Sequence, residues 1–126
     1  MHIADIPSIP DRETRFEEIT VDCYDEYEVL SAFEVYLTDA LRTPFAATWG
    51  APGRAQAERV TVLGVADTDD REGVRLRVRG SDGDEYDVPA DQLWAEDAAS
   101  ANAIVLDDYR AYLAGGGLPF DPIEEE

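Results

Sequence analysis

The longest amphipathic pattern in the chain lies between Val21 and Trp49, in the stretch VDCYDEYEVLSAFEVYLTDALRTPFAATW. A carboxylate at Asp22 or Asp25 is a suitable cap for a helix start, because it accepts hydrogen bonds from the free N–H groups there. Pro44 ends the pattern, since the residue before a proline is pushed out of helical geometry. The stretch predicts one amphipathic helix, with these apolar residues on a single face at 3.6 residues per turn: Val29, Leu30, Phe33, Tyr36, Leu37, Ala40 and Leu41.

Shorter alternating patterns predict a group of strands. Phe45, Ala47 and Trp49 alternate directly after the helix. A β-branched stretch follows over Glu58–Ala66, where Val60 and Val62 face inward and Gly64 is suited to a bulge. Two further strands complete the set, Val74–Arg79 and Asp84–Val88.

The last two strands are expected to pair in a defined register. The apolar residues of VRLRVR face inward and its three arginines face outward. Matching the apolar faces requires an odd number of loop residues, which a loop over Ser81–Gly83 with Gly83 left-handed provides. Arg79 then lies opposite Glu85, and Arg77 opposite Asp87. Each such pair contributes about 0.2–1 kcal/mol, so the arginines are interpreted as neutralisers of a sheet face rather than as a nucleic-acid site.

The rest of the pattern completes the expected fold and gives the expected domain boundaries. A tight helical turn after Val88 carries Leu93 into the core, and Ser100 is suited to cap a helix over Ala101–Ala114. We therefore expect an α+β fold: a small SH3-like, partly closed β-barrel of four to five strands with an N-terminal amphipathic helix and a C-terminal helix. Residues 1–14 are expected to be a disordered lead-in, 15–115 a single domain, and 116–126 an acidic tail.

The charge of the chain narrows the classes of partner. There are 29 acidic residues against 10 basic ones, all of them arginine, for a net charge of −19. Such a surface repels nucleic acid and anionic lipid, so neither is expected as a partner, and no protein partner is identifiable. Adaptation to a high-salt cytosol is the favoured explanation of the total charge. Capture of a hard cation by carboxylates is the alternative.

Other residue types exclude several kinds of site. A single cysteine, Cys23, excludes an internal disulfide framework and a thiolate metal cluster, and one histidine, His2, leaves a zinc site without its usual ligands. No hydrolase, nucleotide-binding or metalloprotease motif occurs. The acids around Cys23 are expected to raise the pKa of its thiol, which disfavours a nucleophilic role. With no signal-peptide pattern and no long apolar run, we expect a cytoplasmic, non-enzymatic protein.

One acidic segment is a candidate cation site. Asp67, Asp69, Asp70 and Glu72 place four carboxylates in six residues, on an expected loop between two strands. Calcium requires six to eight oxygen ligands, which carboxylates and backbone carbonyls supply. The segment is not an EF-hand, because Arg71 stands at the fifth position and Glu72, not glycine, at the sixth. Taken alone, the motif is weak, and a solvated acidic turn is the default interpretation.

A longer pattern resembles the CcbP-like family of small calcium-binding proteins, first seen in cyanobacteria. The family's V-D-x-Y start, its Y-L-x-x-x-L-x-F-P-F-x-A segment and its V-P-x-x-Q-L turn all have counterparts here. The matching residues are Val21, Asp22, Tyr24, Tyr36, Leu37, Leu41, Pro44, Phe45, Ala47, Val88, Pro89, Gln92 and Leu93. The closing helix carries Tyr109 and Tyr112, so the resemblance spans roughly Arg15–Gly115. The chain departs from the family in having Ala32-Phe33 where Gly-Trp is common, and a shorter acidic loop.

The resemblance implies a helix packed on a small β-barrel and Ca²⁺ binding by carboxylates. We therefore expect a calcium buffer or sensor whose principal site is the loop with Asp67, Asp69, Asp70 and Glu72. Asp25 and Glu26, at the start of the first helix, are the expected supplement, although helix capping alone also explains them. The alternative is a salt-adapted acidic interaction module with no specific metal site.

Overall fold

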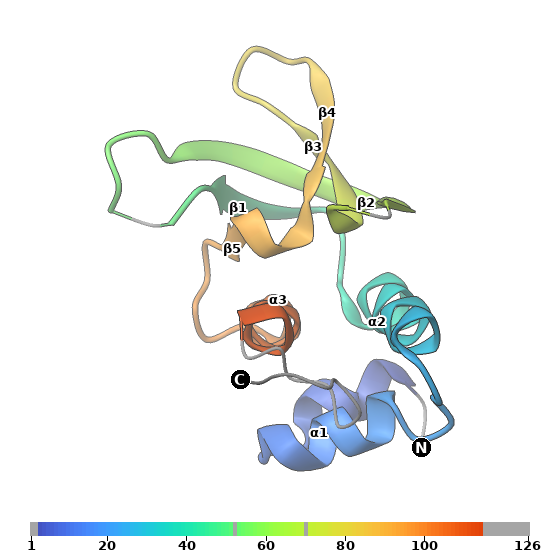
Figure 1. Ribbon diagram of the computed structural model, residues 1–126. Coiled ribbons are helices and arrows are strands. Elements are labelled where there is room, and N and C mark those ends of the chain that lie inside the picture. Colours follow the sequence, from blue (N-terminus) through green and yellow to red (C-terminus); the bar gives the residue numbers. More distant parts are fainter. Residues whose placement is uncertain (1–2, 52, 70, 115–126) are drawn as a thin grey trace.

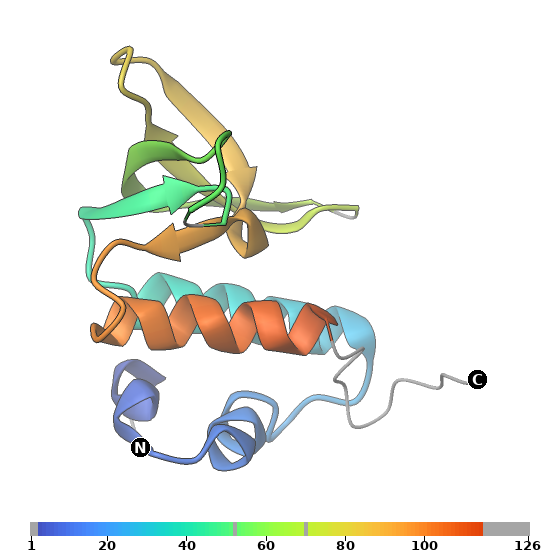
Figure 2. The same ribbon diagram turned by 90° about the vertical axis from the view of Figure 1, so that its left-hand side faces the viewer.

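Two antiparallel helices, α2 (Glu26–Ala40) and α3 (Ala101–Ala114), form the middle layer of a three-layer arrangement. A β-sheet covers one side of them, and the short helices η1 and α1 cover the other (Figures 1 and 2). This computed structural model describes residues 3–51, 53–69 and 71–114. One apolar core joins the layers, because buried side chains of both long helices meet those of the sheet.

Helix α2 has the amphipathic face and the cap that the sequence predicts. Its N-cap is Asp25, whose side chain accepts a hydrogen bond from the Glu28 backbone N–H at 2.8 Å. The buried residues recur at the predicted spacing: Val29, Phe33, Tyr36, Leu37 and Ala40. Phe33 stacks on Tyr112 of α3, with ring centroids 4.5 Å apart. Aromatic packing therefore joins the two helices of the middle layer.

The sheet is antiparallel and open. Its strands are β1 (Phe45–Trp49), β2 (Glu58–Asp69), β3 (Gly73–Arg79), β4 (Glu85–Pro89) and β5 (Leu93–Ala95). They lie in the order β4-β3-β2-β1-β5, so β4 and β5 are the two edges and no pairing closes the sheet within the described residues. The α+β class is confirmed. The closure expected of an SH3-like barrel is not confirmed.

The β3–β4 hairpin has the predicted register. Arg79 pairs with Glu85 and Arg77 with Asp87. Their side chains form ion pairs at 3.4 and 2.9 Å. Gly83 has φ +87°, and its N–H donates to the Gly80 carbonyl at 3.0 Å. The argument from an odd number of loop residues succeeds because a slip of one residue would turn every apolar side chain of β4 to the wrong face.

The connection to α3 also follows the sequence prediction. The 3₁₀ turn η2 (Ala90–Gln92) leads into Leu93, which is fully buried. The Ser100 hydroxyl accepts a hydrogen bond from the Ala103 N–H at 3.1 Å, as a capping residue does. The predicted acidic tail, 116–126, lies outside the described residues. Within the described ranges, no helix is both long and apolar enough to cross a membrane.

The expectation of a disordered lead-in over residues 1–14 is wrong for the part that the structure describes. Ile3–Ser8 form the 3₁₀ helix η1, in which Ile6 and Pro7 are buried. Helix α1 (Arg12–Ile19) follows, and its N-cap Asp11 accepts hydrogen bonds from the N–H and hydroxyl of Thr14 at 3.1 and 2.7 Å. These elements pack there because α2 and α3 present apolar side chains on the side away from the sheet, and η1 and α1 bury that surface from water.

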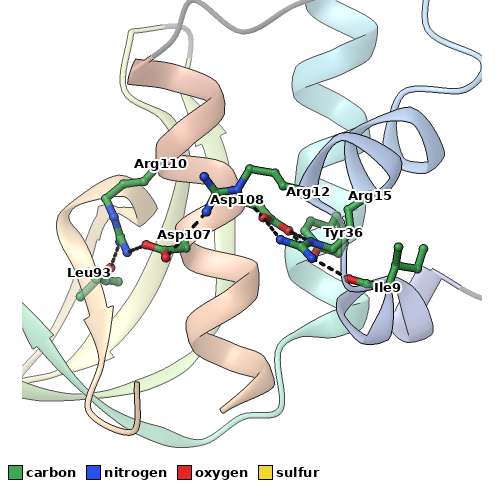
Figure 3. A network of polar contacts seen from close by, with 8 residues as sticks. All are labelled: Ile9, Arg12, Arg15, Tyr36, Leu93, Asp107, Asp108 and Arg110. Carbon is green, nitrogen blue, oxygen red and sulfur yellow. Dashed lines mark hydrogen bonds and ion pairs between the residues drawn. The ribbon is translucent and has the colours of Figure 1, made fainter. Parts of the chain in front are cut away.

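A buried ionic network fastens α1 to both long helices (Figure 3). The Asp108 side chain on α3 is fully buried and accepts two hydrogen bonds from Arg15, at 2.7 and 2.9 Å. The Tyr36 hydroxyl on α2 donates to the same carboxylate at 2.9 Å, and Arg12 donates at 3.2 Å. The pKa of Tyr36 is raised, by burial first and then by the Asp108 charge, so its hydroxyl stays protonated and able to donate.

Helix α3 also anchors the β2–β3 hairpin. The Val74 N–H donates to the buried hydroxyl of Tyr109 at 2.9 Å. The neighbouring Gly73 has φ +75°, and a Cβ added there would overlap the Tyr109 hydroxyl. Glycine at this position therefore allows both the left-handed backbone and the close approach of the tyrosine.

We expect Asp108→Asn to lower the free energy of unfolding by about 3–5 kcal/mol, because it leaves the Arg15 charge buried without a full partner. The matched control is Asp107→Asn, one residue earlier, whose carboxylate is exposed; its cost should stay below about 1 kcal/mol. Urea unfolding measures both. Equal effects of the two substitutions would contradict the assigned role of the network.

We expect Gly73→Ala to destabilise the fold by about 1–3 kcal/mol more than Gly83→Ala. Both glycines have positive φ, but no atom lies within 4 Å of the position that a Cβ at Gly83 would take. The second substitution therefore carries backbone strain without the overlap. Adding Tyr109→Phe to Gly73→Ala should recover part of the loss, and thermal melting of the three variants tests the contact. No recovery would mean that the hydroxyl does not limit residue 73.

Candidate metal centre

The candidate carboxylates lie on a tight hairpin rather than on the predicted loop over Asp67–Gly73. Strand β2 continues to Asp69 and β3 begins at Gly73, with these two residues paired. Asp67 is paired with Arg75 across the strands. The loop prediction is wrong in extent because this cross-strand ion pair offsets the poor strand propensity of Asp67.

Asp67 is held by an arginine of the neighbouring strand. Its two carboxylate oxygens accept hydrogen bonds from Arg75 Nε and Nη2 at 2.7 and 2.6 Å. These bonds lower the pKa of Asp67 and raise that of Arg75. A Glu72 oxygen lies 3.7 Å from Arg75 Nη1. One guanidinium thus lies between two of the predicted ligands.

Asp69 stabilises the turn itself. Its Oδ2 atom accepts hydrogen bonds from the backbone N–H groups of Arg71 and Glu72, both at 2.8 Å. These two amides lower the pKa of Asp69 and keep it ionised. Its Oδ1 atom takes part in neither bond, so one oxygen of this charged group is left for a cation. Asp70, the fourth predicted ligand, lies outside the described residues.

The hairpin end lies beside the first half of α2 (Figures 1 and 2). The Thr68 hydroxyl donates a hydrogen bond to Glu34 of α2. Leu30 Cδ1 is 3.8 Å from the position that a Cβ at Gly73 would take. Glu26 stands four residues before Leu30, one helical turn toward the start of α2, and so on the same face. The two predicted halves of the site therefore come from neighbouring elements.

Asp25 and Glu26 have different environments at that helix start. Asp25 Oδ1 accepts the capping hydrogen bond, which leaves Oδ2 outside it. Both residues are exposed. Capping accounts for Asp25, as the sequence already allowed. The Glu26 side chain takes part in no hydrogen bond or ion pair of the described residues, so capping does not account for it.

The chemistry of this donor set fits a hard cation, but its arrangement is not a finished cage. Carboxylate oxygens are the ligands that calcium prefers. In the described part of the chain, however, no group of three or more His, Cys, Asp or Glu residues is placed to hold a metal ion. Asp67 has both oxygens bonded to Arg75, whereas Asp69 and Glu72 each keep an oxygen free of close hydrogen bonds. Binding by this set requires movement of side chains.

Sequence reasoning missed three contributors to this region: Arg75 as the partner of Asp67, the Tyr109 hydroxyl, and the bond between Thr68 and Glu34. The outward position of Arg75 was predicted, but its partner depends on the β2–β3 register. Two register shifts interrupt that register, between Val62 and Gly64 and between Val65 and Asp67. The Gly64 bulge was predicted and the second shift was not.

The other reactive candidate, Cys23, has the environment expected from the sequence. Its pKa is raised, by burial first and then by the charges of Glu28, Asp22 and Asp25. Its thiol donates to the Glu28 carbonyl, with Sγ and O 3.4 Å apart. A thiol held in the protonated form is a poor nucleophile.

Comparisons with known proteins agree with this fold and with calcium binding. The family model of CcbP proteins, described as calcium binding, matches residues 14–113. The crystal structure of Anabaena CcbP has a TM-score of 0.69 and 30% identity, covering 82% of this chain and 89% of that chain. A calcium-binding protein in its calcium-binding form has a TM-score of 0.69 and 29% identity, covering 92% and 98%. No curated protein sequence matches. As the sequence resemblance predicted, the chain belongs to the CcbP family of calcium-binding proteins.

Proposed function

We propose that this chain binds Ca²⁺ at the end of the β2–β3 hairpin and acts as a calcium buffer or sensor without catalysis. The observation that carries the location is the Asp69 turn. Its carboxylate is kept ionised by two backbone amides and retains a free oxygen. Glu72 and Asp67 are the neighbouring donors, Asp70 is the donor predicted from the sequence, and Asp25 and Glu26 are the supplement from α2.

Arg75 sets the energetic condition for binding in this proposal. Its guanidinium neutralises Asp67 and lies 3.7 Å from a Glu72 oxygen. A calcium ion at these oxygens competes with the guanidinium, which moves away when the ion binds. Each carboxylate exchanges a singly charged partner for a doubly charged one, and the displaced guanidinium becomes hydrated. Selectivity favours Ca²⁺ over Mg²⁺, because an adaptable set of oxygens suits the larger ion and Mg²⁺ dehydrates reluctantly.

A salt-adapted acidic interaction module is the second candidate function, and the net charge of −19 favours it. In that case cations gather around the whole surface and none binds at a defined place. At about 1 M salt the Debye length is near 3 Å, so diffuse attraction is nearly abolished while direct coordination persists. Binding in concentrated KCl therefore separates the two functions.

Four finer features belong to the same proposal. A barrel-like curvature of the sheet is supported by the length of β2, 12 residues, and by its two register shifts. The absence of nucleic-acid and membrane partners is supported by the excess of acidic residues. A cytoplasmic location and adaptation to high salt stay predictions from composition.

The first test compares two acidic turns of the same chain. Asp69→Asn with Glu72→Gln should weaken calcium binding about tenfold or more, because two charged ligands become neutral. Asparagine still accepts the turn amides, so the hairpin keeps its shape. The matched control, Asp82→Asn with Asp84→Asn, makes the same charge change at the β3–β4 turn and should leave the affinity nearly unchanged. Calorimetry in molar KCl measures all three proteins.

Two outcomes of that titration would contradict the proposal. Equal affinity of the wild type and the Asp69/Glu72 variant would place the site elsewhere. No saturable binding by any of the proteins would leave only an acidic surface, as in the second candidate function.

The second test concerns the competing arginine. Arg75→Gln should tighten calcium binding several-fold, because it removes a positive charge from the site and releases Asp67. Arg77→Gln removes the same charge from the next outward position, where the partner is Asp87, and should change the affinity little. Calcium titration of both variants, with melting curves to check their folds, gives the comparison. Weaker binding by the Arg75 variant would mean that this arginine supports the site instead of competing for it.

A further inference from the structure

A cleft at the opposite end of β2 contains both tryptophans of the chain. It has a volume of about 490 Å³ and is lined by Trp49, Trp94, Gln92, Asp91, Glu58 and Arg54 among others. Its size falls within the range of small-ligand sites, roughly 300–1,000 Å³. Glu58 begins β2 and Asp69 ends it, so the part of the cleft that β2 lines lies at the strand end opposite the proposed calcium site.

The Trp49 side chain is held in place at this cleft. Its Nε1 atom donates to Gln92 Oε1 at 3.1 Å, and the adjacent Gly50 N–H donates to the Gln92 carbonyl at 2.8 Å. Trp49 is also paired with Glu58 across β1 and β2, so the carboxylate and the indole lie on the same side of the sheet. Both side chains are half-buried. A fixed aromatic surface beside a carboxylate lowers the entropy lost when a ligand binds.

The two carboxylates of the cleft form no ion pair within the part of the chain that the structure describes. Asp91 is half-buried, like Glu58, and neither forms an ion pair with the arginines of the described residues. Two carboxylates against one arginine, Arg54, leave the lining with an excess of negative charge. A ligand with a positive charge and a flat apolar surface complements both the tryptophans and this charge.

The chain itself contains the same pairing next to the cleft. The Arg110 guanidinium lies over the Trp94 ring, 4.2 Å from its centroid, and is fixed there by bonds to the Leu93 carbonyl and to Asp107 at 2.5 and 2.6 Å. Guanidinium groups stack on aromatic rings and bond carboxylates at the same time, which an ammonium group does less well.

We propose that this cleft binds an arginine side chain of a partner protein, with the guanidinium stacked on tryptophan and bonded to Asp91 and Glu58. The lining of the cleft shares no residue with the proposed calcium site, so its test neither uses nor depends on the position of the metal. It gives the acidic surface one defined contact point for a basic partner.

Intrinsic fluorescence reports on the site directly, because the chain has two tryptophans and both line the cleft. The full chain is titrated in moderate KCl with the blocked peptide acetyl-Gly-Arg-Gly-amide and with its citrulline counterpart, which has the same shape and no charge. We expect saturable binding of the arginine peptide and at least about tenfold weaker binding of the citrulline peptide. Calorimetry accompanies the titration, and no saturable signal by either method would overturn the proposal.

Three variants separate this site from diffuse attraction. Asp91→Asn with Glu58→Gln should weaken binding of the arginine peptide about tenfold. The matched control, Glu17→Gln with Asp39→Asn, removes the same charge from exposed positions on α1 and α2 and should weaken it less than about twofold. Arg54→Gln should tighten binding, since it removes the one positive charge of the lining. Equal weakening by the first two variants, or weaker binding by the third, would overturn the proposal.

Discussion

The buried carboxylate of Asp108 is the constraint on which the arrangement of the helices depends. An ionised group without solvent costs several kcal/mol unless charged and hydrogen-bonding partners replace the lost water. Helix α3 supplies the carboxylate, whereas α1 supplies Arg15 and Arg12, and α2 supplies Tyr36. Asp108 is therefore tolerated inside the protein only while α1 is docked. The same contacts fix the middle layer against which the sheet packs, and through Tyr109 of α3 they reach the β2–β3 hairpin.

Local rules were sufficient for the parts of the fold that the sequence predicts well. The 3.6-residue spacing of α2 and its cap depend only on residues within the helix and next to it. The β3–β4 register depends on the parity of one short turn. Leu93 and Ser100 likewise act within a few residues of their own positions. In each of these cases the physical cause and its signal lie in the same stretch of chain.

The features that the sequence did not predict depend on distant partners. The structural role of Arg15 depends on its partner Asp108, which lies 93 positions later in the chain. Predicting that β2 extends to Asp69 requires the knowledge that Asp67 pairs with Arg75. The register of β3 and β4 followed from the number of residues in their loop, but two register shifts in β2 prevent the same argument for β2 and β3. Four acidic residues within a stretch of six indicated a flexible chelating loop. The structure instead holds Asp67 by an arginine and Asp69 by two backbone amides, because each carboxylate is stabilised by the nearest donor.

Arginine is the only cationic side chain in the described part of the chain, and this links the two proposed sites. In the calcium site that we propose at the hairpin, calcium would replace the guanidinium that neutralises Asp67, so the apparent affinity would be the difference between two attractions. On the same proposal, Arg75 would re-form its pair with Asp67 when calcium is withdrawn, which would suit a reversible buffer or sensor. At the cleft, Asp91 and Glu58 form no ion pair with the arginines of the described residues, so on our proposal the gain from a guanidinium supplied by another protein is not reduced by competition. In the two proposals, arginine chemistry therefore lowers calcium affinity at the hairpin and makes binding of a partner's guanidinium possible at the cleft.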